Sequence, residues 1–373
     1  MTIICIDSRY IGPRPSGIGK VQQALVDHLP QMAGDIEFLL LKRSDAPKSL
    51  SSASNVREVT LSSGANSPAT MWGLPWIAPL SGVDLFHATF NIMPAGLRMP
   101  CVTTVHDIMW LANPQWCTGR LPHALERRFY AHGISRALAK SAAITTVSDA
   151  SKRELLSWDP RLQGRVFTTP PGVDARFRHN PCQSEPTTPG WPTGKHVVLT
   201  VGQYAPYKNH EGALQAFARA FNGREDVALV FIQRLNQASE TLKKLARDLG
   251  IESQVHFLGP VDDDALVACY NSARVLLHPS LCEGYGLPMV EAMACGCPVV
   301  ASDRSAMPEV LDGAGLTAPV EDPDAMAGAL RKVVDDPQVM SSLRQAGLER
   351  ATRLSWRTFA QATLDVYRTI LQR

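Results

Sequence analysis

The chain has 373 residues, of which 45% are hydrophobic and 19% are charged, so it is long enough and apolar enough to fill two ordinary domain cores. Its 37 basic and 35 acidic residues give a net charge of +2, which excludes a globally electropositive protein built to coat nucleic acid. The eight cysteines are scattered along the chain, which argues against a small disulfide scaffold.

The longest apolar runs have the length of strands, far short of the roughly 20 residues that cross a bilayer. The opening residues 1–7 lack a basic start and a small-residue cleavage site, so they are predicted to be a core strand and not a signal peptide. These features predict a cytoplasmic protein.

Strand-like and helical patterns alternate through the first half of the chain. In chain order they predict strands at 2–6, 36–41, 83–86, 101–105 and 143–147, with a helix at 17–29. Such alternation is typical of a parallel sheet with helices on both faces. We therefore predict an N-terminal Rossmann-like domain over residues 1–178.

Proline and small polar residues predominate at 179–195, which are predicted to form a linker. A second alternation predicts another Rossmann-like domain over 196–354. Its expected strands are 196–201, 227–232, 255–258 and 275–277, and its expected helices lie near 210–221 and 238–249. The end, 355–373, is helical by pattern with no strand after it, so we expect it to pack back onto the first domain. Because open α/β sheets bind ligands at strand carboxyl ends, the two domains are predicted to face a central cleft.

The most informative segment is 278–300, where a predicted strand is followed by a loop and a helix. Gly284 and Gly286 lie in that loop, which brings backbone N–H groups and a helix N-terminus to one point that attracts anions. Glu283 and Glu291 flank this point, and carboxylates there would bind hydroxyl groups such as those of a sugar and a ribose. Taken singly, either carboxylate could instead be a solvated or helix-start residue.

Glu283 and Glu291 bracket seven residues, as in the E-x7-E signature of the retaining family 4 glycosyltransferases, which have the GT-B fold. Residues 279–296 resemble that family almost residue by residue. The resemblance implies that Glu283 is catalytic and contacts the donor sugar, that Glu291 holds the ribose, and that loop amides contact the sugar and diphosphate. Those loop residues are Gly284, Tyr285, Gly286 and Leu287.

A second matching element follows the first strand of the second domain. It resembles the family's glycine-rich turn ending in Pro-Arg-Lys-Asn, with Lys208 and Asn209 matching. The match implies that Lys208 is catalytic and places a positive charge against the diphosphate leaving group. The chain departs from the family at Tyr207, where arginine is usual, and at Gln203, where some members carry a phosphate-binding arginine. Either the diphosphate clamp is weaker here, or Arg234 supplies the missing charge from the end of the next strand.

The predicted first domain carries candidates after two of its strands. Its Gly-Ile-Gly turn resembles one that closes over the donor diphosphate in the family, which makes Gly17 a candidate for backbone contact. Asp7 and Arg9 follow the first strand and are acceptor-side candidates. The segment beginning at His106 also resembles the family, which implies that His106 contacts the donor sugar and takes part in catalysis. Asp107 is expected to orient the loop or touch the acceptor.

The resemblance implies hexose transfer with retention, through an oxocarbenium-like transition state in which the donor diphosphate helps to take the acceptor proton. This route requires positioning and charge stabilisation, so we expect no metal ion and no cofactor. The likeness to bacterial mannosyltransferases of polysaccharide biosynthesis implies GDP-mannose as donor, with a UDP-sugar as the alternative. The implied acceptor is a glycan or a lipid-linked saccharide.

Other function classes are weighed against this one. A dehydrogenase requires a complete glycine fingerprint and an acidic ribose ligand, which the chain lacks. A sugar phosphorylase or a nucleotide-sugar epimerase shares only the architecture. A non-catalytic nucleotide-sugar-binding protein stays open because of Gln203 and Tyr207.

A basic helical region contains Arg120, Arg127 and Arg128, and Trp72 and Trp76 lie in a neighbouring segment that is predicted to be loop-like. The ordinary interpretation is a surface helix whose apolar side faces the core. With a lipid-linked acceptor, however, such a helix would also hold the enzyme at the inner face of the membrane through anionic lipid. Peripheral membrane contact is therefore a further expectation.

Overall fold

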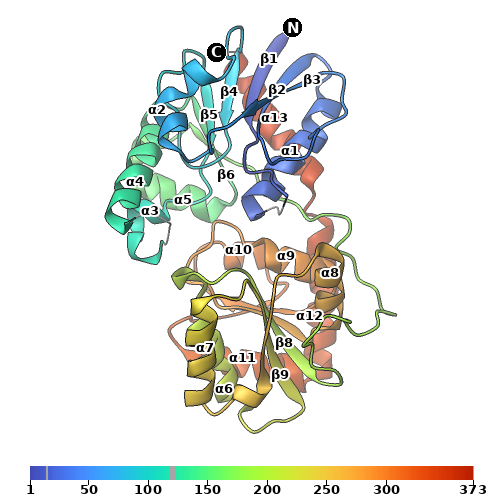
Figure 1. The fold of residues 1–373 in the computed structure, drawn as a ribbon. Helices are drawn as coiled ribbons and strands as arrows, with labels where there is room; N and C mark the ends of the chain where they lie inside the picture. Colours follow the sequence, from blue (N-terminus) through green and yellow to red (C-terminus); the bar gives the residue numbers. More distant parts are fainter. Residues whose placement is uncertain (14–15, 118–121, 373) are drawn as a thin grey trace. The chain divides into compact units, whose positions relative to one another are not determined.

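The computed structural model describes residues 1–13, 16–117 and 122–372, and the chain divides into two compact units (Figure 1). The first unit comprises Met1–Gly172 and Trp356–Arg373, and the second comprises Val173–Ser355. Among the described residues, none of the helices combines the length and the apolar character that spanning a bilayer requires.

In the described part of the first unit, every strand pairs in parallel within one seven-stranded sheet of order β3-β2-β1-β4-β5-β6-β7. The strands are β1 (Thr2–Asp7), β2 (Ile36–Arg43), β3 (Val56–Leu61), β4 (Leu85–Ala88), β5 (Cys101–Thr104), β6 (Ala143–Thr146) and β7 (Val166–Thr168). The helices are α1 (Gly17–Met32), α2 (Pro68–Ile77), α3 (Met109–Ala112), η1 (Pro114–Trp116), α4 (His123–Lys140), α5 (Asp149–Trp158), η2 (Pro160–Leu162) and α13 (Trp356–Leu371).

The second unit repeats this plan with a six-stranded parallel sheet of order β10-β9-β8-β11-β12-β13. The strands are β8 (His196–Val201), β9 (Val227–Ile232), β10 (Val255–Leu258), β11 (Val275–His278), β12 (Val299–Ser302) and β13 (Leu316–Ala318). The helices are η3 (Pro206–Lys208), α6 (His210–Phe221), α7 (Gln237–Asp248), η4 (Glu252–Gln254), α8 (Asp263–Ser272), α9 (Leu287–Ala294), α10 (Met307–Leu311), α11 (Pro323–Asp335) and α12 (Pro337–Thr352). The predicted pair of parallel-sheet Rossmann-like domains is confirmed.

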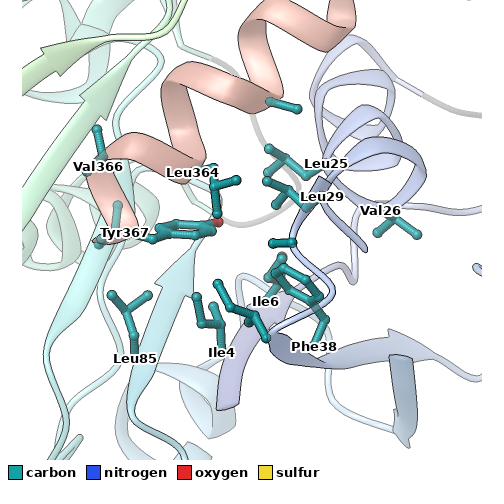
Figure 2. Packing of buried hydrophobic residues seen from close by; sticks show 14 of the residues in the cluster. Ile4, Ile6, Leu25, Val26, Leu29, Phe38, Leu85, Leu364, Val366 and Tyr367 are labelled. Atoms are coloured by element: carbon teal, nitrogen blue, oxygen red, sulfur yellow. The ribbon is translucent and has the colours of Figure 1, made fainter. Parts of the chain in front are cut away.

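One face of the first sheet is covered by α1 and α13 (Figure 2). Ile4 and Ile6 alternate with Cys5 along β1, so the two isoleucines pack on this face while the cysteine packs on the other. Leu364 and Tyr367 of α13 are buried against the isoleucines. The expected return of the C-terminal helix to the first domain is therefore confirmed, and burial of its apolar face stabilises that return.

The other face of this sheet is covered by α2, α4 and α5. Trp72 and Trp76 lie on α2, so the prediction that they belong to a loop-like segment is wrong. Gly73 and Pro75 make this helix hard to predict from the sequence, because both residues are poor helix formers. The carbonyl of Met71, which loses its helical donor to Pro75, accepts instead from the amide of Ala95 at 2.7 Å.

The proline-rich residues 179–195 are part of the second unit. Trp191 is buried there, and a Cβ at Gly190 would lie 3.0 Å from the side chain of Leu258. Asn180 is also tied down, because its amide donates to Oδ1 of Asn271 on α8 at 2.7 Å. The division between the units falls between Gly172 and Val173, ahead of this segment.

Candidate active site

Two loops meet at the carboxyl edge of the second sheet. Asn209, in the left-handed conformation with φ 53°, caps α6 by accepting from the amide of Gly212 at 3.2 Å. Its Nδ2 donates to the carbonyl of Pro279 at 3.1 Å, and the amide of Leu281 donates to the carbonyl of Tyr207 at 2.7 Å. The turn after β8 and the loop after β11 are thereby held together.

The charged centre of this junction is the pair Lys208 and Glu283, whose Nζ and Oε1 are 2.5 Å apart. The same Oε1 accepts from Oγ of Ser280 at 2.8 Å and lies 3.2 Å from Nε2 of His278. All of these contacts fall on one carboxylate oxygen. Within the described residues no hydrogen bond ends on Oε2, so this oxygen retains its capacity to accept.

The electrostatics of this centre keep Glu283 ionised. Burial alone would raise the pKa of its carboxyl, but the Lys208 ammonium and the contact with His278 outweigh burial and hold the pKa well below its usual range. The side chains of Lys208 and Glu283 are 14% and 11% exposed, so the pair is shielded from water yet reachable by a ligand. An ammonium has three donors, and the hydrogen bond from Lys208 to Glu283 uses one of them.

The backbone around Glu283 is anchored by two serines. Ser305 donates from Oγ to the carbonyl of Glu283 at 2.7 Å, and Ser302 donates to the carbonyl of Ser280 at 2.6 Å. Neither serine was singled out from the sequence, and neither was His278 or Ser280 as a partner of Glu283. The only available signal was their position, at the end of β11 and just after β12.

Gly284, Tyr285, Gly286 and Leu287 lead into α9, as the sequence predicts. Gly286 is left-handed with φ 99°, a conformation that favours glycine, and a Cβ there would also displace the flexible Cε of Met289, which would lie 2.5 Å away. Glu291 lies in the following turn, where Oε2 accepts from the hydroxyl of Tyr270 at 3.2 Å. Burial and the Glu291 carboxylate raise the pKa of Tyr270, which therefore stays a donor.

Gln203 and Arg234 meet at the ends of the neighbouring strands β8 and β9. The amide of Arg234 donates to Oε1 of Gln203 at 3.1 Å, and both side chains are exposed. Gln203, which stands where some family members carry an arginine, therefore lies beside Arg234, the arginine that could supply the missing charge.

Two Asp-x-Asp segments, at 262–264 and 322–324, occur in the second unit. Each supplies the start of a helix. Asp262 accepts from the amide of Ala265 at 2.8 Å to cap α8, and Asp322 accepts from the amides of Asp324 and Ala325 at 3.0 Å to cap α11. In the described ranges, no three His, Cys, Asp or Glu side chains are grouped as ligands for a metal ion.

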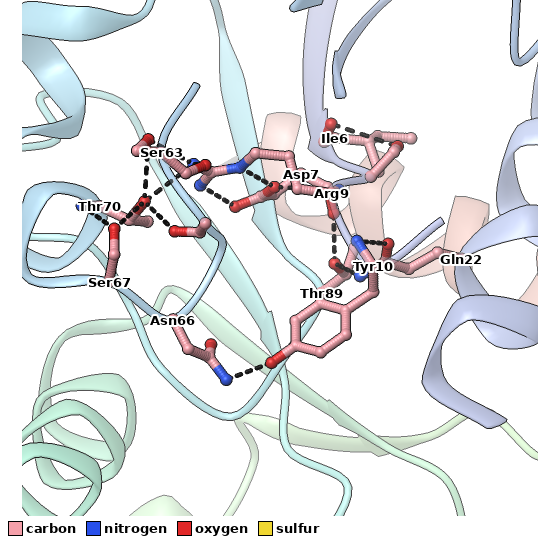
Figure 3. Close-up of polar contacts among 12 residues, drawn as sticks. Ile6, Asp7, Arg9, Tyr10, Gln22, Ser63, Asn66, Ser67, Thr70 and Thr89 are labelled. Carbon is pink, nitrogen blue, oxygen red and sulfur yellow. Dashed lines mark hydrogen bonds and ion pairs between the residues drawn. The ribbon is translucent and has the colours of Figure 1, made fainter. Parts of the chain in front are cut away.

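In the first unit, the acceptor-side candidates Asp7 and Arg9 bind each other (Figure 3). Nε and Nη2 of Arg9 donate to the two carboxylate oxygens of Asp7 at 2.7 and 2.6 Å. Nη1 donates to Thr70 at 2.8 Å and to the carbonyl and hydroxyl oxygens of Ser63, both at 3.1 Å. Arg9 is fully buried, so its observed role is to attach the segment that precedes α2 to the end of β1.

His106 follows β5 and is also buried. Its amide donates to Oδ1 of Asn91 at 2.8 Å, and its Nε2 lies 3.2 Å from the carbonyl of Thr89. Burial lowers the pKa of His106 to about 4, although the contact with Thr89 opposes this. The ring is therefore neutral near pH 7. Asp107 accepts from the amide of Met109 at 3.0 Å at the start of α3, in keeping with a loop-orienting role.

Gly17 is the first residue of α1, and Ser16 caps that helix by accepting from the amide of Gly19 at 3.1 Å. Arg120 lies outside the described residues. The predicted site residues thus form groups inside each unit: the network of Lys208, Asn209 and Glu283 with Glu291 on α9, the neighbours Gln203 and Arg234, the pair Asp7 and Arg9, and the segment of His106 and Asp107.

Comparison with known sequences places the chain in a family. Residues 15–177 match the family described as Glycosyltransferase Family 4, and residues 183–350 match Glycosyl transferases group 1. The MMP alpha-(1->4)-mannosyltransferase of Mycolicibacterium hassiacum is 32% identical over 292 residues, which cover 75% of this chain and 67% of that protein. The O-antigen chain mannosyltransferase B of Escherichia coli is 28% identical, over 77% of this chain and 74% of that protein. The D-inositol 3-phosphate glycosyltransferase of Saccharomonospora viridis is 31% identical over 72% of this chain, and the match covers 64% of that protein.

Solved structures share the fold. Sucrose-phosphate synthase from Thermosynechococcus elongatus aligns over 100% of both chains with a TM-score of 0.74 and 19% identity. WaaG, a glycosyltransferase involved in lipopolysaccharide biosynthesis, aligns over 98% of this chain and 99% of its own with a TM-score of 0.73 and 17% identity. The two family models match residues 15–177 and 183–350 of the chain, and the mannosyltransferase of Mycolicibacterium hassiacum is 32% identical over 67% of its own length. The chain therefore belongs to the family 4 glycosyltransferases of GT-B fold.

Proposed function

We propose that the chain is a retaining, metal-independent hexosyltransferase that moves mannose from GDP-mannose to a glycan or lipid-linked saccharide in bacterial polysaccharide biosynthesis. The names of two relatives, both mannosyltransferases, support the choice of sugar. The observation that carries the activity is the ion pair of Lys208 and Glu283, because it sets a cation and an available carboxylate oxygen beside the start of α9.

Each group has a role that follows from its surroundings. The diphosphate of the donor binds against the Lys208 ammonium and the N-terminus of α9, where the helix dipole favours negative charge. Oε2 of Glu283 accepts from a hydroxyl of the sugar, since Oε1 is already occupied by Ser280 and Lys208. Glu291 accepts from a ribose hydroxyl.

In the transfer step, the bond between the anomeric carbon and the diphosphate oxygen breaks as the acceptor oxygen bonds to the same face of that carbon. The leaving diphosphate keeps the electron pair of the broken bond, and the acceptor proton passes to it. Glu283 stabilises the developing positive charge on the sugar, and Lys208 stabilises the developing negative charge on the diphosphate. His106, neutral and held at Nε2 by Thr89, contacts the sugar as a hydrogen-bonding group.

The test combines a donor panel with chelation. The purified protein is incubated with GDP-mannose, UDP-glucose or ADP-glucose and a saccharide acceptor, with EDTA present throughout, and release of the nucleoside diphosphate is measured. We expect turnover with GDP-mannose in EDTA and an α-linked product by NMR. Turnover only with a UDP-sugar would establish the alternative donor. Activity that requires Mn²⁺ would contradict metal independence, and binding without turnover of any donor would indicate a non-catalytic protein.

A further inference from the structure

His278 is the last residue of β11, and the mechanism described above gives its side chain no role. The residue is only 2% exposed. Its backbone is held inside the second sheet, because β11 lies between β8 and β12 and His278 pairs with Ala301 of β12. A buried imidazole on a central strand has little freedom to move, so its position beside the candidate active site is fixed.

The imidazole of His278 is directed at the carboxylate of Glu283. Nε2 lies 3.2 Å from Oε1 of Glu283 and 3.4 Å from Oγ of Ser280. An ionised carboxylate can only accept, so Nε2 carries a hydrogen and donates it to Oε1. A Cβ at Gly286 would lie 3.6 Å from the same nitrogen. The ring therefore lies close both to Glu283 and to the loop that leads into α9.

Three donors share Oε1 of Glu283, and one of them has a second partner in the proposed function. Nζ of Lys208 is 2.5 Å from this oxygen, and Oγ of Ser280 is 2.8 Å from it. When the donor diphosphate binds, the Lys208 ammonium on its flexible stem is divided between the diphosphate and Glu283. Ser280 and His278 lie at the end of β11, and their contacts continue to hold Oε1 while Lys208 binds the diphosphate.

We propose that His278 is a positioning residue that holds Oε1 of Glu283 and thereby keeps Oε2 facing the donor sugar while Lys208 binds the diphosphate. The final torsion of a glutamate is broad, so a carboxylate held by Ser280 alone can turn away. Stabilisation of the transition state requires an acceptor that is already in place. His278 acts through Glu283, and this inference rests on the proposed function.

Turnover of GDP-mannose tests the positioning role with two substitutions. His278→Phe keeps a ring and removes the donor, and we expect kcat to fall at least about tenfold. The KM for GDP-mannose should stay within about twofold, because the contact matters mainly in the transition state. His278→Gln places an amide donor at a similar reach and should recover most of kcat. The matched control is His196→Gln, at the exposed start of β8, which should turn over normally.

Two kinetic outcomes overturn the proposal. One is a kcat of His278→Phe equal to that of the unaltered enzyme. The other is an equal loss of kcat in His278→Phe and His278→Gln, because the donor at this position would then be irrelevant. Thermal unfolding of each variant is compared with that of the unaltered protein, so that a loss of fold is not taken for a loss of positioning.

A spectroscopic measurement tests the same contact without turnover and without a substituted site. Long-range ¹H–¹⁵N correlation spectra of the full chain report which imidazole nitrogen carries a hydrogen, and the His278 signal is the one that disappears in His278→Gln. We expect a hydrogen on Nε2 both without nucleotide and with GDP bound. A hydrogen on Nδ1 alone overturns the proposal, since Nε2 would then have nothing to donate to Glu283.

Failure of this proposal is distinct from failure of the proposed function. If the unaltered protein turns over GDP-mannose and His278→Phe does so equally well, the proposed function stands and the positioning role falls. If the unaltered protein turns over no donor, the proposed function falls, and the location of the imidazole hydrogen decides whether His278 holds Glu283.

Discussion

The two units place an ion pair at equivalent points and use it differently. β1 and β8 are the first strands of their sheets and occupy the same place in the strand order, and a pair lies beyond the carboxyl end of each. After β1, Arg9 is fully enclosed and its donors go to Asp7, Ser63 and Thr70. After β8, Lys208 and Glu283 remain partly exposed, and Oε2 of Glu283 has spare capacity to accept.

The difference shows how a charge becomes structural or functional. A fully buried guanidinium whose three nitrogens all bind protein oxygens is not accessible to a ligand, and it rigidifies the segment that it joins. An ammonium that shares one short contact can exchange that contact for a diphosphate oxygen. The first unit thus has an enclosed ion pair, Asp7 and Arg9, and the second has a partly exposed pair, Lys208 and Glu283, which we call the poised pair. The predictions below test this contrast.

The largest effect is expected at the enclosed pair. Arg9→Met leaves the Asp7 carboxylate buried without its partner, which costs about 3–5 kcal/mol of unfolding free energy. Urea denaturation should show this loss in the first unit, while affinity for nucleoside diphosphate at the second unit stays within about twofold of the original. The double variant Arg9→Met with Asp7→Leu should recover part of the stability. A folded Arg9→Met protein that loses turnover would instead assign Arg9 to the acceptor site.

The poised pair should respond mainly in turnover, with a smaller loss of stability than at the enclosed pair because both side chains remain partly exposed. Glu283→Ala and Lys208→Ala are each expected to lower turnover by at least about 100-fold, which corresponds to about 2.7 kcal/mol of transition-state stabilisation. The matched control is the exposed pair Glu240 and Lys243, 2.8 Å apart on α7, whose alanine variants should turn over normally. Steady-state kinetics with circular dichroism as a fold check decides the outcome. Near-normal turnover in both site variants would remove this assignment.

Much of the fold and of the site around Lys208 and Glu283 could be predicted from the sequence, because the local sequence patterns there match the secondary structure that forms. The strands β8, β9 and β10 have the predicted bounds and α13 lies within the predicted 355–373, since β-branched runs and helical periodicity are strong in those segments. The loop of Glu283 was recognisable because its glycines and Pro288 specify a strand, a turn and a helix start in order.

What could not be predicted depends on contacts between distant segments. The position of Ser305 against the carbonyl of Glu283 requires β12 to lie beside β11, which the sequence of either strand does not reveal. The helix α2 was missed because its lost hydrogen bond is replaced by Ala95, outside the helix. The bonds of Arg9 to Ser63 and Thr70 could not be predicted because these partners lie far along the chain.

Acid should weaken the first unit more than the second. Burial lowers the pKa of His87 to about 3 and of His106 to about 4 in the first unit, whereas in the second it lowers that of His210 to about 4 and also lowers that of the partly buried His256. A histidine whose folded-state pKa lies below the usual value of about 6.5 must stay neutral in the folded protein, so its full contribution to stability is present above pH 6.5. That contribution is lost as the pH falls toward the folded-state pKa, and the loss is about 2 kcal/mol per histidine at pH 5.

The carboxylate of Glu283 differs from these histidines, because it does not lose its contribution to stability between pH 7.5 and pH 5. Its pKa is depressed from a lower starting value, so its contribution to the second unit persists at pH 5 and is lost only in stronger acid. Hydrogen exchange at pH 7.5 and pH 5, corrected for the intrinsic exchange rate, should show earlier loss of protection in β4 and β5 than in α6. Earlier opening of α6 would contradict this order.

The smallest effect is expected at Glu291, which lies farther from the reacting carbon in the proposed arrangement. Glu291→Ala should weaken nucleoside diphosphate binding about tenfold, because the lost ribose contact is a hydrogen bond to a charged group worth about 1.5 kcal/mol. Calorimetry with GDP and 2′-deoxy-GDP forms a cycle in which the unaltered enzyme prefers the ribonucleotide and the variant does not. Tyr270→Phe is the control, since it removes the hydroxyl that donates to Oε2 of Glu291 and keeps the carboxylate. The contrary outcome is that Tyr270→Phe weakens binding as much as Glu291→Ala does and that both variants still prefer the 2′-hydroxyl. In that case Glu291 serves the packing of α9, and other residues bind the ribose.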